Sequence, residues 1–131
     1  MRRSLMLWMV IASIVLGAFG RPGSAWAHAK MLRALPASGT TVKTAPTIVR
    51  AWFSEELDPK TSTFSVWDSR GRRVDNGKGG VDLNDLDRKS MIVNVKLPGP
   101  GVYTVKWKAV SADDRFSATG SFRFTVAAPG R

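Results

Sequence analysis

The 131-residue chain contains one histidine, His28, and it comes directly after a segment with the features of a secretory signal peptide. Two arginines near the start precede an apolar run over residues 5–19, and a break containing Gly and Pro leads to Ala25-Trp26-Ala27. A basic, then apolar, then small-x-small order predicts export with cleavage after the second small residue. We therefore expect residues 1–27 to be removed after Ala27, which makes His28 the first residue of a mature periplasmic chain.

A histidine at a free amino terminus can bind one metal ion through two nitrogen atoms. Its α-amino nitrogen and its ring Nδ1 close a chelate ring around the metal. The pKa of an α-amino group lies close to neutral pH, so a metal ion can displace the proton of this amine. Two nitrogens in one plane suit Cu(II), which prefers tetragonal N/O geometry and leads the divalent affinity order. The alternative is a solvated histidine that cleavage happens to leave at the terminus.

The composition limits the other kinds of chemistry. The chain has no cysteine, so disulfides and thiolate metal sites are excluded. A single histidine also excludes any metal site that needs two histidines from this chain. Zinc hydrolase chemistry and Ser-His-Asp catalysis with an internal histidine are therefore not expected, and we do not expect an enzyme.

The chain is basic, with twenty Lys or Arg against ten Asp or Glu. Removing residues 1–27 takes three arginines and no acid, which leaves seventeen Lys or Arg against ten acids, a formal charge of +7. A charge of this sign can favour anionic surfaces. However, no single strand or loop of the sequence combines a basic cluster with exposed aromatic residues, so we expect no nucleic-acid partner.

The mature chain shows short β-like runs that end in turn residues, and no convincing helical period. The expected runs cover residues 31–35, 47–53, 64–66, 91–97, 102–110 and 121–126. Residues 77–87 are expected to form a mobile loop or a weak edge, and residues 111–119 a polar loop. This pattern predicts an all-β sandwich of about seven mostly antiparallel strands over residues 28–127, followed by a short tail at residues 128–131.

The order of several segments makes the mature chain similar to a known family. These segments are His28-Ala29-Lys30, Pro36-Ala37-Ser38-Gly39, Ala45-Pro46, Phe53-Ser54-Glu55-Glu56-Leu57, residues 101–107, Val110-Ser111-Ala112-Asp113-Asp114 and Gly120-Ser121-Phe122. In this order and spacing they resemble the CopC family of periplasmic copper-resistance and copper-carrier domains. The resemblance covers nearly the whole mature chain and implies a Greek-key β-sandwich, in the immunoglobulin-like or cupredoxin-like class.

The resemblance also implies a set of Cu(II) ligands. In the family these are the terminal amine and imidazole, an aspartate, and a second histidine two residues after that aspartate. The first part corresponds to His28, and the aspartate corresponds to Asp114, with Asp113 as the alternative. The second histidine would then fall at Phe116, or at Arg115 in the alternative alignment, and neither side chain binds copper.

Two further features of the family can be compared with this sequence. Glu55 matches a family glutamate near the metal, which implies that its carboxylate accepts a hydrogen bond from the terminal amine or the imidazole. The alternative for Glu55 is a surface carboxylate in a loop. The methionine-rich Cu(I) site of some members has no counterpart, because Met31 and Met91 are far apart in sequence, and we expect both in the core.

The sequence therefore predicts a monomeric periplasmic Cu(II)-binding protein that serves copper tolerance, buffering or delivery. The alternative is a CopC-like interaction domain that has lost the metal and docks on a membrane or envelope protein. The resemblance implies one partner besides copper, a CopD-type inner-membrane copper permease.

Overall fold

The computed structural model describes residues 28–130, so the expected leader, its cleavage at Ala27 and the terminal residue Arg131 lie outside the described part of the chain. No helix able to cross a membrane occurs within residues 28–130. The described chain forms eight strands. They are β1 (Met31–Leu35), β2 (Thr41–Val42), β3 (Ile48–Phe53), β4 (Thr63–Trp67), β5 (Gly80–Val81), β6 (Ser90–Asn94), β7 (Gly101–Val110) and β8 (Ser117–Val126).

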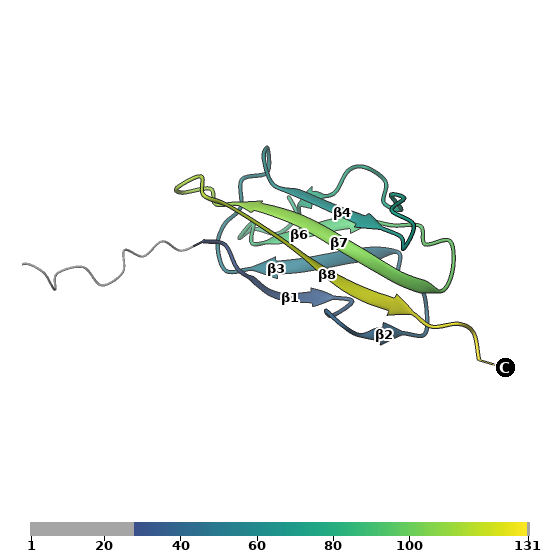
Figure 1. Ribbon diagram of the computed structural model, residues 1–131. Coiled ribbons are helices and arrows are strands. Elements are labelled where there is room, and N and C mark those ends of the chain that lie inside the picture. Colours follow the sequence, from purple (N-terminus) through teal and green to yellow (C-terminus); the bar gives the residue numbers. More distant parts are fainter. Residues whose placement is uncertain (1–27, 131) are drawn as a thin grey trace, which may run out of the picture.

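The strands form two four-stranded sheets. One sheet has the order β1-β3-β6-β5 and the other the order β2-β8-β7-β4. Figure 1 shows the long β7–β8 hairpin in one layer and β1, β3 and β6 in the other. All pairs of strands are antiparallel except β2 with β8, which is parallel. The predicted all-β sandwich with mostly antiparallel pairing is confirmed.

The core forms because apolar residues alternate along the strands that the sequence marks most clearly. On β3, Val49, Ala51 and Phe53 are buried between residues that are partly or fully exposed. Burying one face of each sheet in this way is the main source of stability for such a sandwich. Met91 is fully buried and Met31 packs against the core, as expected from their isolated positions in the sequence.

The structure corrects the prediction of a polar loop over residues 111–119. β8 already begins at Ser117, and Ser117 pairs with Val110 at the end of β7. The sequence signal is weak there because Ala118 and Gly120 are too small to mark an apolar face. β2 and β5 each have two residues, and β5 lies at a sheet edge within the segment expected to be a loop or a weak edge.

Four segments gather at one end of the sandwich, which we call the histidine end: residues 28–30, 54–62, 82–89 and 111–116. Backbone hydrogen bonds join them, from Ser54 N to Lys30 O at 2.9 Å, from Leu57 N to Arg88 O at 2.9 Å and from Ala112 N to Glu56 O at 3.0 Å. In Figure 1 the described chain begins at this end, beside the turn between β7 and β8. The fold thus brings the predicted metal ligands to one end.

Candidate metal site

His28 is held in place by the two residues that follow it. Ala29 is buried, with 2% of its surface exposed. The Lys30 N–H donates to Ser54 Oγ at 2.9 Å, and the Ser54 N–H donates back to the Lys30 carbonyl oxygen at 2.9 Å. These contacts fix the backbone of Lys30 against Ser54, just beyond the end of β3, and the His28 side chain is exposed to solvent.

The turn opposite His28 is shaped by its own side chains and backbone. Asp114 Oδ1 accepts a hydrogen bond from the Phe116 N–H at 3.0 Å. Arg115 has a left-handed backbone with φ of 64°, a conformation that is uncommon for residues other than glycine. The Ser111 N–H donates to the Phe116 carbonyl oxygen at 2.9 Å, which closes the turn. Asp114 therefore sets the position of Phe116.

The rings of His28 and Phe116 are in contact. Their centroids lie 4.8 Å apart and their planes meet at 75°, an edge-to-face arrangement. Arg115 points elsewhere, because its Nη1 lies 3.1 Å from Asp58 Oδ2. Position 116, and not position 115, therefore faces the histidine.

Glu55 has a carboxylate oxygen in an unusual environment. Its Oε2 is shielded from solvent and has no hydrogen-bond partner within residues 28–130. A buried, unpaired carboxylate oxygen is costly, so such an atom normally faces a donor or a cation. Two hydrogen bonds join Lys30 to Ser54, so Glu55, which follows Ser54, lies close to the start of the described chain.

The histidine end is acidic in an otherwise basic protein. Its four segments contain eight of the ten Asp and Glu residues against five Lys or Arg. Hydrogen bonds from the Thr61 hydroxyl and the Lys60 N–H to Asp58 lower the pKa of that carboxyl below its ordinary value, and Arg115 adds to this effect. The lowered pKa keeps Asp58 ionised at neutral pH, and the excess of acidic over basic residues at this end favours cations.

Side chains alone do not complete a metal site here. In the part of the chain that the structure describes, no three His, Cys, Asp or Glu side chains are grouped so that they could hold a metal ion. The histidine end offers one exposed imidazole, and several carboxylates belong to the segments that gather at the same end. The His28 imidazole can bind a metal cation when further ligand atoms, such as the nitrogen of a terminal amine, complete the site.

The structure shows two features of the site that the sequence does not. The contact between the His28 and Phe116 rings joins residues 88 positions apart, and only the fold reveals it. The unpaired Glu55 oxygen likewise depends on packing. In contrast, Asp113 is exposed, and the structure gives it no contact that would distinguish it as a ligand.

The sandwich and its histidine end define a small all-β domain built of two four-stranded sheets. Comparison with known families identifies a CopC domain over residues 31–127. The chain belongs to the CopC family.

Two relatives show the range of this family. The chain is 30% identical over 92 residues to the copper transport protein CutJ of Bacillus subtilis (strain 168), a match that covers 70% of this chain but only 17% of CutJ. It is also 33% identical over 105 residues to protein YobA of Escherichia coli (strain K12), covering 79% of this chain and 82% of YobA.

Solved structures share the fold. CopC from Methylosinus trichosporium OB3b matches with a TM-score of 0.68 at 24% identity, covering 79% of this chain and 97% of that protein. PcoC, a methionine-rich copper resistance protein from Escherichia coli, matches with a TM-score of 0.62 at 30% identity, covering 77% and 100%. The predicted family and sandwich architecture are confirmed.

Proposed function

We propose that the mature protein begins at His28 and binds one Cu(II) ion at the histidine end of the sandwich. The observation that carries this proposal is the contact of the His28 ring with Phe116, 4.8 Å between centroids. The family resemblance puts a second histidine ligand at position 116, or at position 115 in the alternative alignment. This contact supports a site around His28 in which position 116 carries a phenyl ring in place of the imidazole that the resemblance implies.

Each remaining donor has a role in this proposal. The terminal amine and imidazole of His28 supply two nitrogens, and Asp114 supplies an anionic oxygen from the turn that faces His28. Its Oδ1 is bonded to the Phe116 N–H, so Oδ2 is the oxygen available to a metal. The shielded Glu55 oxygen accepts a hydrogen bond from the new amine and fixes its orientation.

The loss of the second histidine suits a carrier. One imidazole fewer weakens the binding of Cu(II) and leaves a coordination position for water or for a ligand from another protein. Such a site exchanges metal more readily than a closed one. We infer a non-catalytic, monomeric periplasmic role in copper tolerance, buffering or delivery, with a CopD-type membrane permease as the partner. The copper-related names of the relatives CutJ and PcoC support this assignment.

The experiment compares the processed protein with two variants in a Cu(II) titration. His28→Ala removes the imidazole, and Lys30→Ala changes an exposed side chain two residues away. We expect one equivalent of Cu(II) to bind the unchanged protein and Lys30→Ala, and the binding to be lost in His28→Ala. Equal affinity in all three proteins would overturn the proposal.

A second function is favoured by exposed apolar side chains at the histidine end. Leu83, Leu86 and Phe116 have 65%, 97% and 38% of their surfaces exposed. Exposed apolar side chains that lie together are typical of contact sites for other proteins, and these three belong to segments that gather at one end of the sandwich. If the processed protein binds no Cu(II), these residues make an interaction domain that docks on an envelope protein the better account.

A further inference from the structure

The outward face of the second sheet carries basic residues and hydroxyls and no acid. We call this the basic face, and it consists of Ser65 and Trp67 on β4, Thr104, Lys106 and Lys108 on β7, and Ser121 and Arg123 on β8. The three strands contain no Asp or Glu at any position. Because side chains alternate along a strand, the three cations share the solvent side of the sheet.

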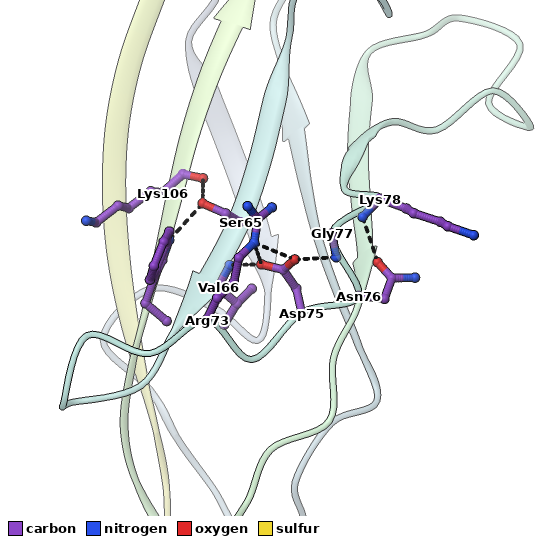
Figure 2. Close-up of polar contacts among 9 residues, drawn as sticks. Ser65, Val66, Arg73, Asp75, Asn76, Gly77, Lys78 and Lys106 are labelled. Atoms are coloured by element: carbon purple, nitrogen blue, oxygen red, sulfur yellow. Dashed lines mark hydrogen bonds and ion pairs between the residues drawn. The ribbon is translucent and has the colours of Figure 1, made fainter.

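The three cations of this face are not neutralised. Lys106, Lys108 and Arg123 are exposed, and none of the ion pairs found within residues 28–130 involves them. Arg73, at the margin, differs because its Nε lies 2.8 Å from Asp75 Oδ1, as Figure 2 shows. The basic face therefore keeps its charge for a ligand outside the molecule.

An aromatic ring lies among these cations. Lys106 Nζ is 5.1 Å from the centroid of the Trp67 ring, and the Trp67 Nε1–H donates to Ser65 Oγ at 2.9 Å. Figure 2 shows Lys106 and Ser65 side by side on neighbouring strands. The sequence gives no sign of this grouping, because Trp67 and Lys106 belong to different strands. The fold thus combines basic and aromatic side chains where no single segment does.

Two open hollows cross the basic face. One, of about 700 Å³, is bordered by Trp67, Lys106 and Arg123, and the other, of about 460 Å³, by Ser65, Lys106 and Lys108. Ser121 borders both hollows. Asp68 at the rim of the first is bonded to Arg72 and to its own turn. The surface is therefore hollowed, lined with hydroxyls and positively charged.

The charge of the protein is distributed unevenly. The histidine end holds eight acids and five basic residues, whereas the rest of residues 28–130 holds two acids and eleven basic residues. On the basic face the cations occupy successive outward positions on neighbouring strands and do not converge on one point. Such a spread of charge matches an extended anionic surface better than a single small anion.

We propose that the basic face binds the phosphodiester headgroups of an anionic phospholipid membrane. Lys106, Lys108 and Arg123 supply the charge, the Ser121 hydroxyl donates to phosphate oxygens, and Trp67 lies at the level of the headgroups. The strands then run along the membrane, and the histidine end stays open to solvent. This binding does not depend on copper.

The test measures sedimentation of metal-free protein with vesicles of phosphatidylglycerol and phosphatidylcholine, or of phosphatidylcholine alone. The protein used begins at His28, because the apolar run over residues 5–19 would itself favour lipid and residues 28–130 contain the core described above. The face variant is Lys106→Gln with Lys108→Gln and Arg123→Gln. The control removes three exposed charges from the histidine end, as Lys30→Gln with Lys60→Gln and Lys89→Gln.

We expect the unchanged protein to bind only the anionic vesicles and to be released by salt. The face variant should lose affinity by on the order of 100-fold and the control by less than about threefold. A second variant, Lys106→Arg with Lys108→Arg and Arg123→Lys, keeps the charge and should bind, which separates loss of charge from loss of fold.

Three results would overturn the proposal. They are equal losses in the face variant and the control, equal binding to neutral and anionic vesicles, and binding to heparin without binding to anionic vesicles. The last result would assign the basic face to a polyanionic glycan.

Discussion

The imidazole of His28 rests edge-on against the phenyl ring of Phe116, with 4.8 Å between the ring centroids. Phe116 follows Asp114 by two residues, and the Asp114 carboxylate holds the Phe116 backbone at 3.0 Å. His28 is thus in direct contact with the turn between β7 and β8. The predictions about metal binding follow from this contact.

Phe116→His should strengthen the binding of Cu(II). The new imidazole would stand against His28 and supply the missing nitrogen ligand. Ligand-orienting contacts alone are commonly worth 10–100-fold in metal affinity, so we expect a gain of at least about tenfold. Competition with a chromophoric chelator measures the gain. Phe116→Leu is the control, and an equal affinity of both variants would argue against position 116 facing the metal.

Glu55→Gln should weaken Cu(II) binding by about 10–100-fold if the Glu55 carboxylate orients the terminal amine. Its Oε2 is shielded and has no hydrogen-bond partner among the described residues, so this oxygen contributes no hydrogen bond to the stability of the described fold. The matched control is Glu56→Gln, because Glu56 is the exposed neighbouring residue. The same competition titration serves here, and similar losses at both positions would assign the effect to general charge.

Asp114→Asn should weaken Cu(II) binding more than Asp113→Asn. Asparagine keeps an oxygen that can accept the Phe116 N–H, so the turn is preserved while the anionic ligand is removed. Alanine at position 114 would confuse the two effects, since it also removes the hydrogen bond. Isothermal calorimetry on the processed protein gives both affinities. Equal effects would show that the assignment of the aspartate to position 114 is wrong.

Gly120→Ala should destabilise the sandwich by about 1–3 kcal/mol, typical of overpacking. A Cβ at this position would lie 2.4 Å from Trp107 Cζ2 and 2.7 Å from its Cε2. The Trp107 ring packs edge-on against Phe53 in the core, 5.1 Å between centroids, so it has little room to move. Urea unfolding measures the change. Gly99→Ala, where no atom lies within 4 Å of the new Cβ, should leave stability nearly unchanged.

Acid should destabilise the protein partly through Asp85. The Ser90 hydroxyl at 2.8 Å and two backbone N–H groups lower the pKa of the Asp85 carboxyl in the folded state. A pKa lowered by folding contributes stability above the ordinary value of 3.8, and this stability is lost as pH falls through the lower folded pKa. Urea unfolding should therefore show Asp85→Asn less stable at pH 7, with a smaller difference near pH 2. A difference that does not shrink would contradict the pKa assignment.

The fold could be predicted from the sequence where one face of a strand is clearly apolar. β3 and β7 alternate between buried apolar residues and more exposed residues, and both strands are found where that pattern puts them. The start of β8 was missed because Ala118 and Gly120 give no such contrast. β2 is held by only two residues paired in parallel with β8, and this pairing leaves no local signal in the sequence.

The candidate site was predictable only in part. His28 stands out as the single histidine beside an expected cleavage position, and Asp114 and Glu55 follow from the family resemblance. The sequence left positions 115 and 116 as alternatives for the missing ligand. The left-handed backbone at Arg115 and its ion pair with Asp58 turn that side chain away, which is a property of the folded turn. The grouping of Trp67 with Lys106 was likewise hidden, because it crosses from β4 to β7.

The most direct test of the central claim is a Cu(II) titration of the protein beginning at His28, followed by electron paramagnetic resonance. The same domain with one extra residue ahead of His28 is the comparison, since it keeps every side chain and removes only the chelating amine. The account predicts a tetragonal signal with nitrogen couplings that saturates at one equivalent and is lost in the extended protein. The same affinity and spectrum in both proteins would contradict it.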